Sequence, residues 1–576
     1  MRRRGGFSFK RALAAGLTGG FLLLPAVASA VDAPVVTQPF HVTRNDLSPA
    51  RLYSSPYLAA DPSNSKVIVG VVAELRSRRC GLVYSRDGGA TWAQGRELPA
   101  PNDYANCVWS NWAAQSAMGR NGTAYVAITG WDERDGGPRQ GNMAPIVART
   151  ANLGDSWDAT ILAPVRGKEG EAVEQYRPSS LVVDAKRGSS DIVYAAFTRT
   201  QPNMVAPNQE PSRPMVAVST DGGRTFGTPV DLSRGVYTDA VRQEIYSAAT
   251  TTTVGPGTTT TSTTTPAAGS RRATPNQEAN FGGTNARLAI DDKGTVYAVW
   301  RSAQSNQAND VPVAPSTFVS VSRDRGQTWE TNRVTDYTVG AASRVAWTKQ
   351  GAPDGSLVII FGRNPTTGTA GNGDIMVQRS TDGGRTWTEP RNITDDAPGD
   401  MVAQFNPSLS AAPNGRLDAA WWDTRDDPGI RANSVYHAYS EDGGQTWSAN
   451  RAISDQPINR TFGVWAVNFD VTSPVGLASS NEVAVFAWDD TRNSEGGPEA
   501  INSEFGAGVQ DVFAAAAQFA AIGGGGWPPV AKVVVAAVAG LAVVAVALLL
   551  AATMAKRGRP PEPRVGSEPR APAGVG

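Results

Sequence analysis

The octapeptide Ser440-Glu-Asp-Gly-Gly-Gln-Thr-Trp447 decides the fold, because versions of it recur along most of the chain. Its Asp-Gly-Gly segment is typical of a tight turn in which the aspartate side chain bonds nearby backbone amides. The Thr-Trp pair then begins a return strand with an aromatic anchor, so each copy predicts a β-hairpin. Close copies occupy residues 85–92, 219–226, 322–329 and 380–387, and a weaker copy runs from Thr150 to Trp157.

The segments between the copies predict further strands. Residues 287–291 and 295–300 are one such pair, so each period of about 60 residues holds four strands. The second strand of each period can be counted independently, at residues 67–72, 123–128, 191–197, 295–300, 356–361, 416–421 and 482–488. The last period lacks an octapeptide and a fourth strand, whereas residues 39–46 resemble the fourth strands elsewhere. We therefore predict an all-β, seven-bladed β-propeller closed by the N-terminal strand, with six blades as the alternative.

Both ends of the chain have the composition of targeting segments. Residues 1–30 combine a basic start, an apolar stretch and Ala28-Ser29-Ala30, which is typical of a signal peptide for either the Sec or the twin-arginine route. Residues 533–555 carry no charge and are long enough to cross a hydrocarbon layer of about 30 Å. Lys556 and Arg557 follow directly, and the positive-inside rule places them in the cytoplasm.

The expected organisation follows from these segments. Residues 34–522 form the propeller, interrupted by a disordered Thr-rich insertion at residues 248–280. A Gly/Pro linker at residues 523–532, a transmembrane helix at 533–555 and a cytoplasmic tail at 556–576 complete the chain. We therefore expect a single-pass cell-membrane protein with an extracellular ectodomain.

Composition excludes several classes of function. Lysine plus arginine and aspartate plus glutamate are equal at 53 each, so there is no positive field to attract nucleic acid. The two histidines, His41 and His437, leave little room for a Ser-His-Asp triad or a histidine zinc site, and no metal or other cofactor is expected. Cys80 and Cys107 are predicted to form a disulfide after export. Calcium binding and the oligomeric state stay open.

Antiparallel strand order sorts the loops into two faces. The octapeptide turns, with the structural aspartates Asp87, Asp221, Asp324, Asp382 and Asp442, belong to one face. The loops after each second strand and the connections between periods belong to the other face, where arginines recur. Guanidinium groups grip carboxylates with two hydrogen bonds, so these arginines predict an anionic or polyhydroxyl ligand. The candidates are Arg199, Arg301, Arg363, Arg425 and Arg492 after second strands, and Arg177, Arg287 and Arg344 before first strands. The alternative is that each arginine pairs with neighbouring aspartates to fix its own loop.

The octapeptides resemble the Asp-box (BNR) repeat of sialidases and related propellers, and the resemblance spans roughly residues 35–519. It implies a propeller in which three arginines hold a carboxylate, a tyrosine backed by a glutamate is the nucleophile, and an aspartate is the acid/base. This chain has Ser54 where the family's motif arginine is expected and Phe405 near the expected nucleophile. Asp132 and Glu133 are the candidate acid/base residues.

Two hypotheses of different classes follow. The first is a membrane-anchored propeller that engages an extracellular glycan or other polymer through its Arg/Asp-rich face without catalysis. The second is an exo-α-sialidase-type glycoside hydrolase. The missing motif arginine and nucleophile favour the first, whereas the sequence identifies neither the ligand nor the linkage that an enzyme would cleave.

Overall fold

The computed structural model describes residues 33–48, 51–75, 77, 79–99, 104–105, 114–132, 143–163, 175–200, 212–234, 236, 282–303, 316–335, 339, 343–363, 373–397, 402–427, 431–463, 473–494, 501–502 and 506–519. One compact unit extends over Pro34–Phe519. Among the described residues, no helix has both the length and the hydrophobicity needed to span a membrane. The predicted signal peptide, Thr-rich insertion, linker, transmembrane helix and tail lie outside them.

The described part of this unit consists of β-sheets, as predicted, and the first five sets of strands follow the chain. The first sheet holds β3 (Tyr53–Asp61), β4 (Asn64–Glu74), β5 (Arg79–Ser85) and β6 (Ala93–Glu97). A nine-stranded sheet contains two sets. One set comprises β8 (Ala114–Met118), β9 (Ala124–Asp132), β10 (Met143–Thr150) and β11 (Asp158–Ile161), with β7 (Tyr104–Ala105) beside β9 and a short 3₁₀ turn, η2 (Arg120–Gly122). The other comprises β12 (Gln175–Asp184), β13 (Ile192–Thr200), β14 (Arg213–Ser219) and β15 (Val230–Asp231). Next come β16 (Gly282–Ile290), β17 (Val296–Ala303), β18 (Thr317–Ser322) and β19 (Glu330–Thr335), then β20 (Arg344–Thr348), β21 (Ser356–Arg363), β22 (Asp374–Ser380) and β23 (Arg391–Asn392).

Two more sheets complete the unit. One holds β24 (Gln404–Ala411), β25 (Leu417–Asp423), β26 (Ala432–Ser440) and β27 (Arg451–Ala452), with β28 (Ile458–Asn459) beside β26. The other holds β29 (Gly476–Ser479), β30 (Val483–Asp490) and β33 (Asp511–Gln518), and its outer positions are filled by β1 (Val35–Val36) and β2 (Phe40–His41) from the N-terminus. A small separate pair joins β31 (Ile501–Asn502) and β32 (Gly506–Ala507).

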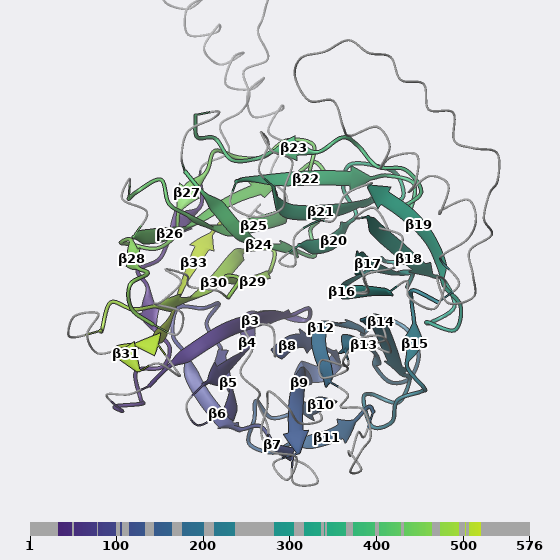
Figure 1. Ribbon diagram of the computed structural model, residues 1–576, viewed down its shortest axis with the longest axis horizontal. Helices are drawn as coiled ribbons and strands as arrows, with labels where there is room; N and C mark the ends of the chain where they lie inside the picture. Colours follow the sequence, from purple (N-terminus) through teal and green to yellow (C-terminus); the bar gives the residue numbers. More distant parts are fainter. Residues whose placement is uncertain are drawn as a thin grey trace, which may run out of the picture. The chain divides into compact units, whose positions relative to one another are not determined.

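The first strands of successive sets contact one another in a cycle within this unit. Strand β3 contacts β8, β8 contacts β12, and the contacts continue through β16, β20, β24 and β29 back to β3. Figure 1 shows the sheets of the unit set around a common centre, with these strands innermost. Loops at one end of the inner strands therefore come together near the centre, although they are far apart in sequence.

Apolar side chains fill the spaces between neighbouring sheets. Between the last two sheets, one buried cluster contains Phe405, Trp422, Phe486, Trp488 and Phe513. Trp422 and Trp488 are fully buried, and burying large aromatic rings supplies much of the driving force for packing one sheet on another. Side chains alternate between the two faces of a strand. Every residue of β25 is buried, so both faces of this internal strand are covered.

The octapeptide turns are held by their aspartates. In the copy at residues 380–387, the Asp382 carboxylate accepts hydrogen bonds from the Ser380 hydroxyl (2.8 Å), the Thr386 amide (2.9 Å) and the Thr386 hydroxyl (2.6 Å). The Trp387 indole donates to the Gly384 carbonyl at 3.2 Å. Asp87, Asp221, Asp324 and Asp442 make the corresponding bonds in their own turns. Each aspartate carboxylate therefore stabilises its own turn.

The N-terminal segment is joined to the last sheet by backbone and side-chain bonds. Val35 and Val36 pair with Gln518 and Ala517, and Phe40 and His41 pair with Ala514 and Phe513. This is the pairing that the sequence predicts for the first strand. It covers the free edge that β33 would otherwise present to other chains.

Asp511 is the polar centre of this junction. Its fully buried carboxylate accepts hydrogen bonds from Arg51 Nε (2.6 Å), Thr43 Oγ1 (3.0 Å) and Asn493 Nδ2 (2.8 Å), and lies 3.1 Å from His41 Nε2. Burial alone would raise the pKa of this carboxyl, but the hydrogen bonds from His41, Arg51 and Asn493 outweigh it and hold the pKa well below its usual value. Asp511 is therefore ionised across the neutral and mildly acidic range.

We expect Asp511→Asn to lower the free energy of unfolding by about 3 kcal/mol at pH 7, because it leaves the Arg51 charge without its buried partner. The folded-state pKa is depressed, so the stabilisation is present above the unfolded carboxyl pKa of about 3.9 and is lost as pH falls through the folded value. Urea unfolding at a series of pH values measures both effects.

The control is Asp354→Asn, which breaks an exposed ion pair with Lys293 and should leave the urea midpoint unchanged. Equal midpoints for Asp511→Asn and the wild type at pH 7 would contradict the role given to Asp511.

We expect Asp382→Ala to destabilise the protein by about 2 kcal/mol, since the turn loses several hydrogen bonds to a charged acceptor. Asp292→Ala removes a similar carboxylate from a solvent-exposed pair with Lys186 and should cost less than about 1 kcal/mol. Denaturant unfolding of both variants tests the difference, and a cost no larger for Asp382→Ala than for Asp292→Ala would refute it.

Candidate functional site

Strand register places the octapeptides and the candidate arginines at opposite ends of the sheets. In β13 and β14, Val193 pairs with Ser219, the first residue of an octapeptide, whereas Arg199 pairs with Arg213 at the other end. In β17 and β18, Val296 pairs with Ser322 and Arg301 pairs with Thr317. The predicted sorting of turns and arginines onto different faces therefore holds in these sheets.

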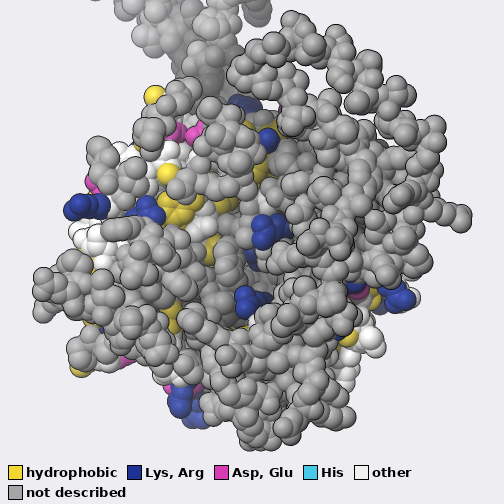
Figure 2. Space-filling model, in the orientation of Figure 1, with side chains coloured by type: hydrophobic (Ala, Val, Ile, Leu, Met, Phe, Trp, Pro, Cys, Tyr) yellow, Lys and Arg dark blue, Asp and Glu magenta, His cyan; other side chains and the backbone are white. Residues whose placement is uncertain are grey.

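A central arginine cluster, defined here as Arg287, Arg301 and Arg344, lies on β16, β17 and β20; Arg287 is near the middle of β16, and Arg344 is the first residue of β20. Arg287 is 3% exposed and donates a hydrogen bond to the Ser179 carbonyl of β12. Arg301 Nε donates to Thr284 Oγ1 at 3.0 Å within its own sheet. In Figure 2, dark-blue Lys and Arg side chains gather near the middle of the ring of strands.

The positive charges of this cluster repel one another. Burial, followed by the positive charges of Arg344 and Arg301, lowers the pKa of Arg287 to about 9, although Tyr57 partly offsets this. Burial also lowers the pKa values of Arg344 and Arg301. Arginine side chains stay protonated at neutral pH, so the inner strands hold like charges together at a cost in free energy. An anion bound among them would relieve that cost.

Tyr57 of β3 is part of the same surroundings, and sequence reasoning did not select it. Arg344 Nη2 donates to the Tyr57 hydroxyl at 3.4 Å, and the guanidinium carbon lies 5.9 Å from the ring centroid. The register of β3 against β4 shifts between Ser54 and Tyr57, which changes the face toward which the following residues point. In the sequence, the proline directly before Tyr57 is the available signal of an irregular strand. The register shift itself forms only when β3 pairs with β4 in the folded sheet.

The remaining candidates are placed separately. Arg177 of β12 donates to Gln175 Oε1 of its own strand at 3.2 Å. Arg199 and Arg363 lie half-buried near the ends of β13 and β21. Asp132 is the last residue of β9, where its backbone pairs with Tyr104. Glu133 lies outside the described residues.

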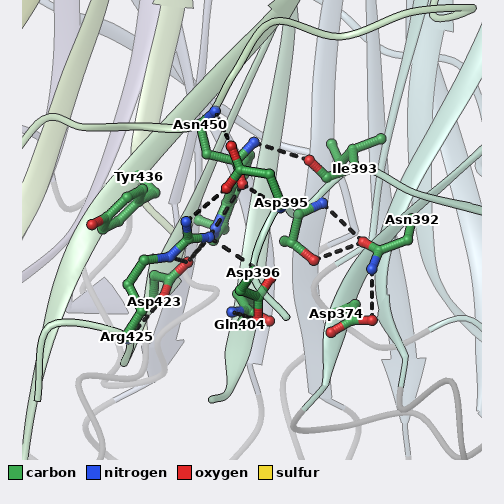
Figure 3. A network of polar contacts seen from close by, with 12 residues as sticks. Asp374, Asn392, Ile393, Asp395, Asp396, Gln404, Asp423, Arg425, Tyr436 and Asn450 are labelled. Carbon is green, nitrogen blue, oxygen red and sulfur yellow. Dashed lines mark hydrogen bonds and ion pairs between the residues drawn. The ribbon is translucent and has the colours of Figure 1, made fainter. Parts of the chain in front are cut away.

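Arg425 is built into a network that joins two sheets (Figure 3). Its guanidinium donates to Asp423 Oδ2 (3.0 Å), Asp395 Oδ1 (2.7 Å) and Asn450 Oδ1 (3.2 Å), and it lies 4.4 Å from the centroid of the Tyr436 ring. Burial alone would lower the pKa of Arg425, but the bonds to Asp423 and Asp395 raise it above the usual value.

Arg492 follows the same pattern one sheet further along. It pairs with Asp490 (2.8 Å) and Asp455 (2.7 Å) and stacks over Phe513 at 4.2 Å. For Arg425 and Arg492 the geometry favours the alternative of structural ion pairs over the ligand contacts that the sequence suggested. Both side chains fix the loops in which they lie.

The family resemblance assigns functional roles to two positions, the motif arginine and the nucleophile, and both hold buried residues here. Ser54 is 1% exposed and donates to Asp489 Oδ2 at 2.8 Å. Phe405 is buried beneath the Arg460 guanidinium, which lies 5.2 Å from the centroid of its ring. Cys80 is fully buried in β5, and the described residues include no free cysteine. Cys107 lies outside them, so its pairing with Cys80 stays a prediction.

One comparison with known proteins identifies the repeat. The family model described as BNR/Asp-box repeat matches residues 438–449, which include the octapeptide at 440–447. No curated protein matches the chain. The chain therefore carries the Asp-box repeat and in this respect resembles the sialidase-like Asp-box propellers, as the sequence predicts.

Similar solved structures share little sequence with the chain. An α-L-arabinanase of Penicillium chrysogenum, complexed with arabinobiose, has 11% identity and a TM-score of 0.40, over 67% of this chain and 94% of that one. A protein of unknown function from Dyadobacter fermentans has 13% identity and a TM-score of 0.40, over 73% and 97%. The Trypanosoma rangeli sialidase in complex with sialic acid has 12% identity and a TM-score of 0.40, over 74% and 55%. At these scores the likenesses identify no substrate.

Proposed function

We propose that this protein is a seven-bladed, sialidase-like propeller that binds a carboxylate-bearing glycan at its central arginine cluster and does not cleave it. The cycle of contacts from β3 through β29 and back to β3 supports seven blades. The binding proposal rests on the burial of Arg287 on β16, next to the inner strand β20 that carries Arg344 and its bond to Tyr57, and the lowered pKa of Arg287 supports it.

The physical argument is one of charge compensation. Guanidinium groups that repel one another in a partly desolvated site attract an anion more strongly than the same groups in water, because the local dielectric constant is lower. A carboxylate matches the planar fork of a guanidinium, which favours it over a spherical anion. The Tyr57 hydroxyl beside Arg344 adds a group that can bond a sugar hydroxyl.

The argument against catalysis rests on the buried positions. Ser54 and Phe405 replace the motif arginine and the nucleophile, and both side chains are used in packing. In the part of the chain that the structure describes, the Tyr57 hydroxyl bonds Arg344 rather than a glutamate. A tyrosine needs an adjacent base to act as a nucleophile.

We also propose that the protein is exported by residues 1–30 and anchored by residues 533–555, with a Cys80–Cys107 disulfide in the ectodomain. The uncharged length of residues 533–555 and the basic residues after it support the anchor. Protease treatment of intact cells should remove the ectodomain and leave a short membrane-bound fragment.

We expect N-acetylneuraminic acid to bind the purified protein, and Arg344→Ala to weaken binding about 10- to 100-fold, since a charge-assisted bond is lost. Isothermal titration calorimetry measures the affinity. The control is Arg323→Ala, which removes an exposed arginine from an octapeptide turn and should leave the affinity unchanged. Equal affinities for Arg344→Ala and the wild type would exclude the central arginine cluster as the site.

The second candidate, a sialidase-type hydrolase, is favoured by one observation: Tyr57 faces the arginines from an inner strand. In that case a fluorogenic sialoside would be hydrolysed, and Tyr57→Phe would abolish turnover while N-acetylneuraminic acid still binds. We expect no turnover by the wild type. Hydrolysis lost in Tyr57→Phe would replace the binding proposal with the enzymatic one.

A further inference from the structure

A pocket lies where the chain between β2 and β3, here called the N-terminal connector, meets the first sheet. Its volume is about 570 Å³, within the usual range for pockets that hold small ligands. Asp46 and Arg51 line it from the segment between β2 and β3, and Tyr53, Glu74, Arg79 and Glu97 line it from the first sheet. Its described lining includes no member of the central arginine cluster.

The lining of this pocket includes Gly81 of β5, and packing does not require a glycine at this position. A Cβ atom added to Gly81 of β5 would meet nothing within 4 Å. The same atom would lie 2.6 Å from Leu58 Cδ2 at Gly70 of β4, and 2.8 Å from the Leu153 carbonyl at Gly95 of β6. Packing therefore requires the glycines at positions 70 and 95 but not at 81.

Gly81 also lies at an irregularity of the sheet. The pairing of β5 with β6 shifts register between Gly81 and Val83. A glycine inside a strand weakens it, and such positions often mark a bulge or a place where a ligand approaches the backbone. Since the space above Gly81 opens into the pocket, a ligand can contact the backbone of β5 there.

The walls of the pocket are polar, and their side chains bond one another or neighbouring groups. The Tyr53 hydroxyl donates to Asp46 Oδ2 at 3.0 Å, and Arg79 pairs with Glu97 at 2.6 Å. Arg51 is fixed on Asp511 of β33, and Glu74 accepts the Leu52 amide at 3.2 Å. Carboxylates have lone pairs for more than one donor, so these residues can still accept hydrogen bonds from a ligand.

The balance of charge indicates what kind of ligand fits. Among the described lining residues, the carboxylates of Asp46, Glu74 and Glu97 stand against the guanidinium groups of Arg51 and Arg79. This mixture favours neither a strong anion nor a strong cation. Hydroxyl groups suit it, because each can donate to a carboxylate and accept from a guanidinium or a backbone amide. We infer that this pocket is a binding site for a neutral mono- or disaccharide, separate from the central arginine cluster.

The test is calorimetric titration of the full-length protein with glucose, galactose, mannose and N-acetylglucosamine, one at a time. At least one should bind with a dissociation constant in the millimolar range. Gly81→Leu, which fills the pocket from its floor, should weaken that binding at least about tenfold, and Gly81→Ala should change it less than about threefold, since a single methyl group leaves most of the volume.

Further variants separate this site from the proposed function. Glu97→Gln alters an exposed wall residue and should weaken the neutral sugar about threefold or more, which keeps the test decisive if Gly81→Leu fails to fold. Binding of N-acetylneuraminic acid should persist in Gly81→Leu, and neutral-sugar binding should persist in Arg344→Ala. No binding of any of the four sugars, or undiminished binding by both Gly81→Leu and Glu97→Gln, would overturn the inference.

Discussion

The junction between the first and last segments of the unit is the constraint on which the rest depends. Hydrogen bonds from β1 and β2 to β33 join residues that are more than 400 positions apart in the chain. Asp511 adds a buried carboxylate that gathers side chains from the N-terminal connector and the last sheet. The inner strands can converge at one centre only if the first and last sheets are neighbours. The arginines of β16 and β20 lie on strands that contact each other directly, whereas Tyr57 comes from β3, which is not next to β20 in the cycle of inner strands.

Charge is used differently in different parts of the structure. Around Asp511, Asp423 and Asp490, each buried carboxylate has a guanidinium partner, and these pairs fix loops and sheet edges. Both histidines belong to such groups, His41 with Asp511 and His437 with the buried pair of Arg416 and Asp418. At the central arginine cluster, burial and the positive charges of Arg344 and Arg301 lower the pKa of Arg287. A strongly perturbed pKa in a cluster of charged groups is one mark of a candidate binding site.

The sequence predicted the fold better than it predicted the site. The sequence selects Arg177, Arg287 and Arg344 as one set of candidates before first strands; Arg287 and Arg344 belong to the central arginine cluster with Arg301, whereas Arg177 bonds Gln175 of its own strand. Arg425 and Arg492 look identical to ligand-binding arginines in the sequence, because both follow a buried strand and an aspartate. Only the positions of Asp395 and Asp455, contributed by neighbouring sheets, show that these side chains pair within the protein. The sequence does not indicate that Tyr57 lies beside Arg344, because a register shift in β3 changes the face toward which the Tyr57 side chain points.

The sequence by itself determined the repeated hairpin, the all-β class and the pairing of the N-terminal strand with the last sheet. These features depend on local turn chemistry and on counting strands, both of which can be read along the chain. Tertiary structure alone decided which arginines share one environment, which are consumed in ion pairs, and that a pocket opens above Gly81. The physical reason is that side-chain charge and free space depend on neighbours from other sheets, and their distances are set by packing and strand register rather than by spacing in the sequence.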